Sequence, residues 1–337
     1  MKTMTYRQAL NDALLIEMER DERVLILGED VGPHGGARAV TKGLFDRFGS
    51  ERVIDTPISE LAMSGAAVGL AFSGFRPVLE NYIGDIIMFM ADSLVTSAAK
   101  LHFATNGRLR VPMVVRGCDP SRPDGGPHQD TLAAWFAHIP GLKVVVPATP
   151  ADAKGLLASA IRDDNPVIVF EPFQLYDTEG PVPEGEYTVP IGKARVCVAG
   201  KDLTLVAVGG SLPHAMAAQE RWARQGVSIE VVDPRTLRPL DTATIRDSVR
   251  KTGRLVVVHE GWVTYGIGAE IIACVCEGPE LLLTAPAERL GTLDTHLPAS
   301  IALTSAVLPG AARIDVAVEK VMAAAGRRVS KAADAAL

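Results

Sequence analysis

The chain alternates short apolar segments with longer segments of helical periodicity, and this alternation limits the folds that it can adopt. In its second half the apolar segments lie about 25 residues apart, at 203–208, 229–232 and 255–258. Strands at this spacing, with helices between them, are typical of βαβ units in a parallel sheet. The aromatic content of 5% indicates aliphatic cores, as in parallel sheets that helices cover on both faces. The sequence therefore predicts an α/β fold with two three-layer domains, each built on a parallel sheet.

The first half carries a comparable series of apolar segments and ends in a stretch of different composition. The segments expected to be strands are 24–27, 53–54, 77–80, 111–116, 143–147 and 167–170. Residues 171–200 are then rich in proline and glycine, which marks a domain boundary. We expect one domain over residues 1–195 and a second over 196–326. Residues 327–337 are expected to form a disordered tail.

Charge and cysteine content exclude several functional classes. The formal net charge of −6 gives no electrostatic reason to expect binding to nucleic acid or to an anionic membrane. The four cysteines show neither a disulfide framework nor paired metal-binding spacing, which is typical of a reduced, intracellular protein. No apolar run reaches membrane length without glycine, serine or charge, and the N-terminus lacks a signal-peptide core. We therefore expect a cytoplasmic protein.

An acidic residue ends the stretch around which the first domain is organised. Asp55-Thr56-Pro57-Ile58-Ser59-Glu60 precedes an uncharged run of small and apolar residues at 61–71. Thr56 is a favourable helix cap and Pro57 suits the first helical position, but neither choice explains Glu60 as a capping residue. The helix dipole alone also favours an acid at this place. From these residues, Glu60 is either a functional acid at the start of a buried interface helix or an acid that only stabilises the helix.

Three further segments hold residues of catalytic type. The glycine-rich turn at 28–36 places Glu29 where a strand ends, and open α/β sheets bind ligands there, although a simple surface turn is the alternative. This turn is not a phosphate loop, because no Gly-Lys-Ser/Thr follows it. His128 lies in a loop rich in Gly, Pro and Asp, where a histidine is more often solvated than catalytic. The turn at 265–270 resembles a dinucleotide fingerprint without its third glycine, which makes a nicotinamide dehydrogenase a weak alternative.

Seven blocks of sequence resemble one protein family in the same order and at the same spacing. The blocks are Gly28-Glu29-Asp30-Val31, Asp55-Thr56-Pro57-Ile58-Ser59-Glu60, Trp135-Phe136-Ala137-His138-Ile139-Pro140-Gly141-Leu142-Lys143-Val144, Asp152-Ala153-Lys154-Gly155-Leu156, Ala160-Ile161-Arg162-Asp163, Asp233-Pro234-Arg235-Thr236 and Lys251-Thr252-Gly253-Arg254. The family that they resemble is the β subunit of the thiamine-diphosphate-dependent 2-oxo acid dehydrogenases, which includes the pyruvate, branched-chain and acetoin enzymes. The resemblance runs from about residue 4 to residue 325, nearly the whole chain.

The resemblance implies a fold and an activity. It implies that residues 1–195 form a thiamine pyrimidine-binding domain and that residues 196–326 resemble the transketolase C-terminal domain. The implied activity is oxidative decarboxylation of a 2-oxo acid, or of a related ketone such as acetoin, with acyl transfer to a lipoyl domain. The implied enzyme is an oxidoreductase that is active only with an α subunit.

The resemblance also implies roles for individual residues. Glu60 matches the acid that hydrogen-bonds a pyrimidine nitrogen of thiamine and promotes loss of the thiazolium proton, and burial can keep such a carboxyl group protonated. His128 matches an active-site histidine that serves acyl transfer to the lipoyl arm. Glu29 matches an acid near the cofactor and the substrate. Ile86 stands where the family tends to have Phe or Tyr against the pyrimidine, so it keeps an apolar contact without the aromatic face.

A potassium site is the metal site that the resemblance implies. The main-chain carbonyl groups of Met113, Ala160, Ile161, Asp163 and Asn165 match a structural potassium site in relatives. Main-chain oxygens suit a hard ion of low charge, and a turn that is satisfied by its own backbone is the alternative.

The loop around His128 departs from the family pattern. The family usually has Gln-His-Ser-Gln there, whereas this chain has Pro127-His128-Gln129-Asp130. Asp130 would orient the imidazole of His128, or raise its pKa, if the two side chains meet. Since this loop serves the substrate in the family, the change puts the substrate in doubt more than the cofactor.

One motif of thiamine enzymes is missing from the chain. Gly-Asp-Gly marks the site for Mg²⁺ and the diphosphate, and Gly84-Asp85-Ile86 is the nearest sequence here. We therefore expect thiamine diphosphate to be shared with an α subunit that holds Mg²⁺, in an α2β2 heterotetramer that also binds a lipoyl acyltransferase core. Gly65 and Gly69, four residues apart, suit close packing across a subunit interface. A non-catalytic scaffold subunit, which binds the α chain and the acyltransferase core, is the alternative that Ile86 and the altered loop support.

Overall fold

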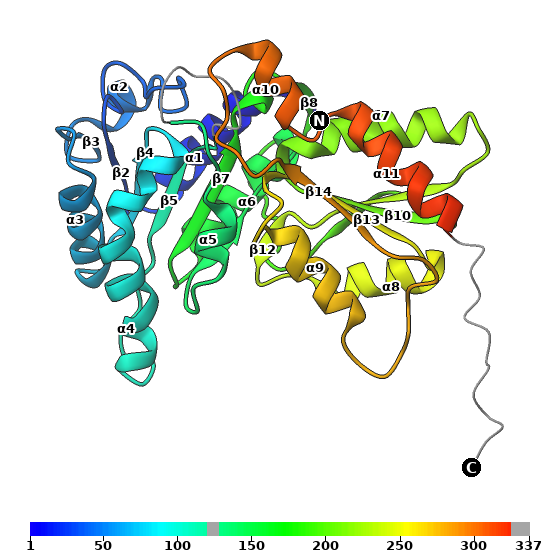
Figure 1. The fold of residues 1–337 in the computed structure, drawn as a ribbon. Coiled ribbons are helices and arrows are strands. Elements are labelled where there is room, and N and C mark those ends of the chain that lie inside the picture. The colour runs from blue at the N-terminus through cyan, green and yellow to red at the C-terminus, as the bar shows by residue number, and fades with distance from the viewer. Residues whose placement is uncertain (120–127, 325–337) are drawn as a thin grey trace.

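The structure of the chain, a computed structural model, describes residues 1–119 and 128–324 and contains two large, mostly parallel β-sheets (Figure 1). Each sheet is covered by helices on both faces, which confirms the predicted α/β class with two sheets. The predicted disordered tail at 327–337 lies outside the described residues.

The first sheet has seven strands in the order β12-β6-β7-β5-β4-β2-β3. Strands from the N-terminal half pair in parallel, and β12 adds an antiparallel edge strand from the C-terminal half. The chain steps outward from β2 to β3 and then returns to β4 on the other side of β2, so the strand order switches between β2 and β4. The strands are β2 (Val24–Gly28), β3 (Val53–Asp55), β4 (Arg76–Asn81), β5 (Val114–Asp119), β6 (Lys143–Val145), β7 (Val167–Pro172) and β12 (Thr236–Arg238).

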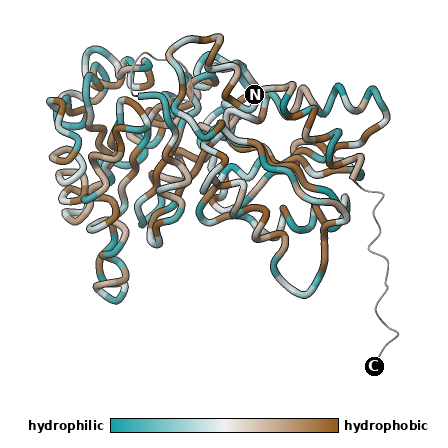
Figure 2. The backbone as a smooth tube through the Cα atoms, viewed as in Figure 1, coloured by the Kyte–Doolittle hydropathy of each residue, from teal (hydrophilic) through white to brown (hydrophobic). Residues whose placement is uncertain are grey.

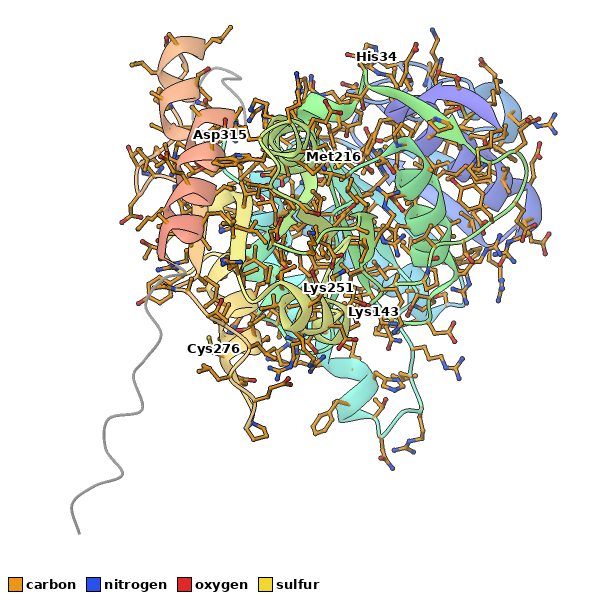
Figure 3. The ribbon with its side chains drawn as sticks, turned by 90° about the vertical axis from the view of Figure 1, so that its right-hand side faces the viewer. His34, Lys143, Met216, Lys251, Cys276 and Asp315 are labelled. Carbon is orange, nitrogen blue, oxygen red and sulfur yellow. The ribbon has the colours of Figure 1, made fainter. Side chains whose placement is uncertain are left out.

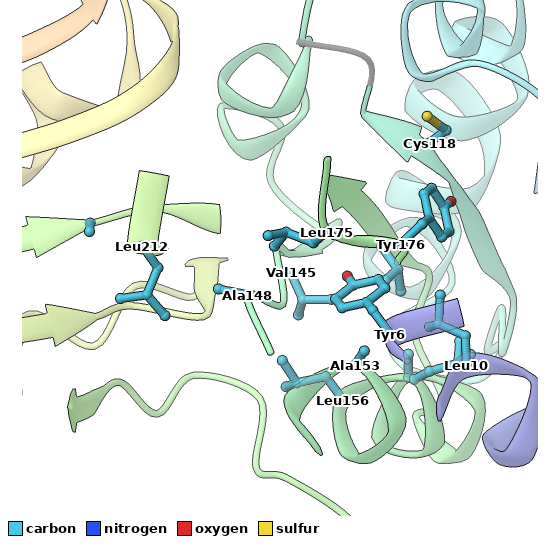
Figure 4. Close-up of a cluster of buried hydrophobic side chains, with 14 of the residues drawn as sticks. Tyr6, Leu10, Cys118, Val145, Ala148, Ala153, Leu156, Leu175, Tyr176 and Leu212 are labelled. Atoms are coloured by element: carbon cyan, nitrogen blue, oxygen red, sulfur yellow. The ribbon is translucent and has the colours of Figure 1, made fainter. Parts of the chain in front are cut away.

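One face of the first sheet is covered by α1 (Tyr6–Arg20) and α6 (Pro150–Arg162), which pack against each other. Thr149 caps α6 by accepting a hydrogen bond from the N–H of Asp152 at 3.1 Å. Figure 4 shows Tyr6 and Leu10 of α1 beside Ala153 and Leu156 of α6 in the buried core. This core is aliphatic with few rings, in agreement with the composition.

The other face is covered by α3 (Glu60–Phe72) and by the segment that follows β4. That segment is a series of three short helices, a 3₁₀ helix η1 (Gly84–Met90), a π-helix η2 (Asp92–Ala98) and α4 (Ala99–Ala104). Mid-helix 3₁₀ and π turns are frequent at functional sites. Smaller elements around this sheet are β1 (Lys2–Thr5) with β8 (Glu179–Val182), α2 (Leu44–Phe48), α5 (Ala133–Ala137) and η3 (Phe173–Leu175).

The second sheet has five strands in the order β14-β13-β10-β11-β9, and β9 is its antiparallel edge. Helices α7 and α11 cover one face while α8 and α9 cover the other. The elements are β9 (Arg195–Val198), β10 (Leu203–Ala207), η4 (Gly209–Ser211), α7 (Leu212–Ala223), β11 (Ile229–Asp233), α8 (Thr242–Thr252), β13 (Leu255–Trp262), α9 (Ile267–Cys276), β14 (Glu288–Thr292), α10 (Ile301–Val307) and α11 (Ala311–Ala324). Figure 2 shows hydrophobic backbone segments gathered along the strands of both sheets.

The last two helices, taken together as Ile301–Ala324, are long and apolar enough to span a membrane, by length and composition only. About 28% of their most apolar part is buried in the structure. In the structure α11 nevertheless packs on α7 and β14. Asp315 of α11 accepts hydrogen bonds from Arg221 Nε at 3.1 Å and from Trp222 Nε1 at 2.9 Å, and it faces α7 in Figure 3. The helix therefore covers the second sheet as part of the folded core.

Candidate active site

Glu29 and Glu60 come together at the carboxyl ends of two neighbouring strands. Glu29 directly follows β2, Glu60 is reached from β3 through residues 56–59, and β2 and β3 pair in parallel. The strand order switches direction at β2. Open α/β sheets bind ligands outside the carboxyl ends of their strands at such a switch point. The fold therefore places both acids where a ligand can reach them.

The carboxyl group of Glu29 has an unused polar atom. Its Oε1 is buried and has no hydrogen-bond partner. Burial raises the pKa of Glu29, and the negative charges of Glu60 and Asp30 raise it further. A carboxyl group in such surroundings retains its proton to higher pH than a solvated one. Because buried polar atoms are nearly always paired, Glu29 Oε1 marks a place for a polar group of a ligand or partner.

Asp55, the last residue of β3, forms a hydrogen bond with the turn that contains Glu29. The N–H of Gly32 donates a hydrogen bond to Asp55 Oδ1 at 2.7 Å, and a Cβ atom at Gly32 would lie 2.5 Å from Asp55 Oδ2. Gly36, with φ of +83°, donates its N–H to the carbonyl of Asp30 at 2.8 Å. The first residue of the motif that ends in Glu60 thus positions the turn that carries Glu29.

Glu60 is the first residue of α3, which corrects the predicted start of this helix. The residue before the helix is Ser59, and its side chain makes no capping hydrogen bond. Thr56 does not cap the helix because its hydroxyl group donates to Sδ of Met63 at 2.6 Å. Pro57 accordingly lies in the connection before the helix. The half-buried side chain of Glu60 sits at the positive end of the helix dipole.

His128 lies beside Asp85, with its Nδ1 atom 3.3 Å from Asp85 Oδ1. The predicted partner Asp130 turns toward the second domain, where its Oδ2 lies 3.4 Å from Nδ1 of His296. Neither a hydrogen bond nor an ion pair joins Asp130 to His128 in the described part of the chain, so the structure does not support orientation of His128 by Asp130. His296, in the segment between β14 and α10 of the second domain, reaches Asp130, whereas His128 lies against the segment after β4.

Asp85 is a candidate site residue that sequence reasoning did not identify. It stood in the sequence only as part of an incomplete diphosphate motif, beside Ile86. Both residues belong to η1, which packs against α3, the helix of Glu60. Burial raises the pKa of Asp85, and the charge of His128 opposes this rise. The half-buried Ile86 and the Asp85–His128 pair therefore stand on the segment that lines the Glu60 helix.

The five residues of the predicted potassium site gather around the end of α6 and the start of β5. Arg76 of β4 donates two hydrogen bonds of 3.0 Å from Nη1, to the carbonyl oxygens of Ile161 and Asp163. The carbonyl of Met113 accepts from the N–H of Val167 at 3.0 Å, and that of Ala160 accepts from Asp163 at 3.2 Å. Asn165 completes the turn through its N–H, which donates to Asp163 Oδ1 at 2.9 Å.

This turn already carries hydrogen bonds at four of the predicted carbonyl groups. Each carbonyl oxygen keeps a second lone pair, so a monovalent ion can share these atoms with Arg76 and the backbone. Among residues 1–119 and 128–324, no group of three or more His, Cys, Asp or Glu is placed to hold a metal ion. The potassium site stays a prediction.

The chain matches two families over most of its length. Residues 2–178 match the family "Transketolase, pyrimidine binding domain", and residues 192–314 match "Transketolase, C-terminal domain". A solved structure entitled "Split gene transketolase, inactive beta4 tetramer" has the same fold. Its TM-score is 0.79 at 22% identity, and the match covers 95% of this chain and 99% of that one. The fold and the two family matches therefore define a transketolase-like protein with a pyrimidine-binding domain.

Curated relatives narrow this class. "Pyruvate dehydrogenase E1 component subunit beta, mitochondrial" of Dictyostelium discoideum is 44% identical, over 91% of this chain and 88% of the relative. The protein of the same description in Drosophila melanogaster is 44% identical, over 99% and 92%. "Pyruvate dehydrogenase E1 component subunit beta" of Rhizobium meliloti is 42% identical, over 95% and 70%. The chain belongs to the β subunits of the 2-oxo acid dehydrogenase E1 components, thiamine-dependent oxidoreductases that act with an α subunit.

Proposed function

We propose that this chain is the β subunit of a pyruvate dehydrogenase. With an α subunit it would decarboxylate pyruvate oxidatively and pass the acetyl group to a lipoyl domain of an acyltransferase core. The observation that carries the proposal is the convergence of Glu29 and Glu60 at the switch point of the first sheet. The descriptions of the curated relatives support pyruvate as the substrate. A branched-chain 2-oxo acid or acetoin is the second candidate, because Ile86 and the His128 loop depart from the family pattern.

The residues of the site fit the pyrimidine end of thiamine diphosphate. When bound, this cofactor supplies the carbon nucleophile for attack on the 2-oxo group. Glu60 would hydrogen-bond a ring nitrogen of the pyrimidine and hold or release a proton there, while Ile86 offers an apolar surface to the ring. The unpaired Oε1 of Glu29 is a polar atom that bound cofactor or substrate would satisfy.

His128 would serve the later acyl transfer. Its side chain is 42% exposed, so an acceptor arriving from another subunit can reach the imidazole, whereas Asp85 behind it is only 11% exposed. A proton on Nδ1 that points to Asp85 leaves Nε2 free to exchange a proton with the acceptor. Asp85 would thereby act as a positioning residue for His128.

The α subunit would bind along the exposed side of α3 and the segment after β4. Large apolar side chains there are exposed to solvent: Ile58 by 80%, Leu61 by 57%, Phe89 by 57% and Phe103 by 90%. Exposed apolar patches of this kind mark interaction surfaces. The patch lies next to Glu60, where a partner that holds the diphosphate and Mg²⁺ has to approach.

Cofactor sharing tests the proposal first. The chain is titrated with thiamine diphosphate and Mg²⁺ in a calorimeter, alone and together with its α subunit. We expect weak binding by the isolated chain and tight binding by the assembly. Micromolar binding by the isolated chain would contradict a shared site.

Turnover by the reconstituted complex then tests the substrate. Pyruvate, 2-oxoisovalerate and acetoin are compared through NADH formation, and we expect the highest kcat/KM with pyruvate. A preference for one of the other two would replace pyruvate but keep the enzyme class. Turnover of none of the three, in an assembly that binds the cofactor, would favour the non-catalytic scaffold subunit.

We also propose a potassium ion at the turn around Arg76. Thermal unfolding of the chain in KCl, NaCl and choline chloride of equal ionic strength tests this proposal. A bound ion stabilises the folded state by mass action, so K⁺ should raise the midpoint above that in choline. Equal midpoints in the three salts would show a turn that Arg76 and the backbone satisfy without an ion.

A further inference from the structure

A cavity of about 880 Å³ lies between the two halves of the chain. Its walls come from the end of β5 and from α5 on one side, and from β12, the end of β13 and the start of α9 on the other. Apolar side chains such as Val208, Leu237 and Ile267 form much of the lining. Glu29, Glu60, Ile86 and His128 are not among the lining residues. The proposed function therefore leaves this cavity without a role.

Two buried polar atoms in the cavity wall have no hydrogen-bond partner. Asp119 is 4% exposed, and its Oδ2 accepts a hydrogen bond from Thr131 Oγ1 at 2.8 Å, while Oδ1 is unpaired. His259 is 3% exposed, and its Nε2 is unpaired. Unpaired buried polar atoms are rare in folded proteins, and each calls for an explanation. Two of them in the wall of one cavity indicate a polar ligand.

A second carboxyl group comes from the opposite wall. Glu260 at the end of β13 accepts a hydrogen bond at Oε1 from the side-chain amide of Gln174, which joins the two domains. Burial, together with the charge of Asp119, raises the pKa of Glu260 to about 8, and the hydrogen bond from Gln174 opposes this rise. Burial also raises the pKa of Asp119 to about 7. The two carboxyl groups lie close enough to repel each other, and no ion pair to either is recorded among the described residues.

The charges of the lining favour a cation. Among the residues that the structure describes, the lining holds the carboxyl groups of Asp119, Glu260 and Glu270 and one guanidinium group, that of Arg238. Arg238 Nη1 is occupied, because it donates to the carbonyl of Ala137 at 3.0 Å. Burial, with a contribution from Arg289, lowers the pKa of His259 to about 4, so its ring is neutral near pH 7.

The shape and the ligand atoms of the site favour an organic cation over a metal ion. Aromatic rings of Trp135, Trp262 and Tyr265 belong to the lining, and such rings attract ammonium and guanidinium groups. The described residues place no group of three or more His, Cys, Asp or Glu where they could hold a metal ion.

We propose that the interdomain cavity binds a small organic cation, an ammonium or guanidinium group on an apolar body, through the carboxyl groups of Asp119 and Glu260. The N–H groups of the ligand pair with both carboxyl groups, and its apolar body lies against the aliphatic and aromatic walls. Since Asp119 comes from the first domain and Glu260 from the second, the ligand links the two domains.

Binding of this kind releases protons. With pKa values of about 8 and about 7, Glu260 is mostly protonated near pH 7.5 while Asp119 is only partly protonated, and a bound cation favours the ionised forms of both. The other titratable groups among the described lining residues are Glu270, Arg238, His138, His259, Tyr265 and Cys274. Calorimetry in two buffers of different ionisation enthalpy counts the released protons directly.

Hexylammonium chloride is the probe, and the chain is used together with its α subunit. 1-Heptanol and sodium hexanoate have chains of similar size but carry no charge or a negative charge. We expect saturable binding of hexylammonium with proton release at pH 7.5, at least tenfold weaker binding of heptanol, and no binding of hexanoate. Fluorescence of Trp135 and Trp262 gives an independent signal from the cavity wall.

Near-isosteric variants assign the binding to the two carboxyl groups. Glu260→Gln and Asp119→Asn should each weaken hexylammonium binding at least tenfold and reduce proton release. Glu319→Gln, at an exposed position on α11, is the matched control and should leave both unchanged. If circular dichroism shows that one of the two cavity variants does not fold, hexylammonium binding by the other variant tests the proposal. Equal binding of hexylammonium and heptanol, or unchanged binding in the folded cavity variants, would overturn the proposal.

Discussion

Nδ1 of His128 lies 3.3 Å from Oδ1 of Asp85, so the histidine of the loop is held by a carboxyl group from the segment after β4. The pair joins two parts of the chain that are 43 residues apart in sequence (128 minus 85). An orienting carboxylate fixes the tautomer of an imidazole and stabilises its protonated form. Asp85 is therefore expected to matter for the step that uses His128 and not for cofactor activation.

Asp85→Asn tests this relationship. An amide keeps the volume of the side chain but does not stabilise a protonated imidazole, so activity coupled to the lipoyl domain should fall about tenfold or more. Cofactor affinity should remain. The ¹⁵N signals of the His128 ring should show a changed tautomer balance, which a purely structural role would not produce. Asp130→Asn, which alters the acid that faces His296, is the control; an equal loss of activity there would refute a special role for Asp85.

Glu60→Gln is expected to abolish activation of the cofactor while the fold survives. Glutamine can still contact the pyrimidine nitrogen but cannot hold or release the proton, and loss of a proton-transfer group costs about 10² to 10⁴ in rate. Hydrogen–deuterium exchange at the thiazolium carbon, followed by NMR in the reconstituted complex, measures this step. Near-normal exchange would mean that Glu60 only stabilises the start of α3.

His128→Ala should separate the two steps. Because His128 pairs with Asp85 and is not recorded in contact with Glu60, deuterium exchange at the thiazolium carbon should be largely preserved. Activity in an NADH assay that requires the lipoyl domain should be suppressed. Loss of exchange as well, in a folded complex that still binds cofactor, would place His128 in cofactor activation.

The α/β class and the strand–helix alternation could be predicted because both rest on local sequence, whereas Glu29 and Glu60 were assigned to the site by the family resemblance. Apolar strands can be recognised from a few consecutive residues. Thr149 and Asp152 mark the start of α6 through a direct hydrogen bond between them. The relative placement of the two acids needed only the parallel pairing of β2 and β3.

Long-range side-chain contacts could not be predicted from the same information. Asp85 meets His128 within the first domain, and Asp130 meets His296 of the second domain, because segments far apart in the sequence pack together in the folded chain. The start of α3 was misplaced because the hydroxyl group of Thr56 bonds the sulfur of Met63 and is not available as a cap. Similarly, no local pattern predicts that β12, which comes from the second half of the chain, pairs with β6 in the first sheet.

Gly69→Leu tests the interface on α3. A Cβ atom at Gly69 would meet no atom within 4 Å, so the isolated chain has room for the new side chain and should keep its thermal midpoint. The same side chain should block close approach of the α subunit and lower the assembled fraction in analytical ultracentrifugation. Gly310→Leu is the matched control. A Cβ atom at Gly310 would also meet no atom within 4 Å, and this residue directly precedes α11 instead of lying on α3. Normal assembly of Gly69→Leu would show that this side of α3 is not the interface.

Asp233 gives a prediction about stability and pH. The side chain is fully buried. Burial and the charge of Asp152, opposed by Arg195, raise its pKa to about 7. In the unfolded chain an aspartate titrates near pH 3.9. Between these values the folded state binds more protons than the unfolded state. The free energy of unfolding therefore falls as pH rises from about 4 to about 7, by up to about 1.4 kcal/mol per pH unit.

Asp233→Asn removes this titration, so the variant should become more stable relative to the wild type as pH increases. Thermal midpoints of the two proteins are compared at pH 5.0 and pH 7.5, and the difference, variant minus wild type, should be larger at pH 7.5. If the substitution only removed a packing contact, the difference between the midpoints of the variant and the wild type would be the same at both pH values. Asp247→Asn, at a side chain that is 72% exposed, serves as the control and should leave the difference constant. A constant difference in Asp233→Asn would show that the carboxyl group of Asp233 is ionised throughout this range in the folded protein.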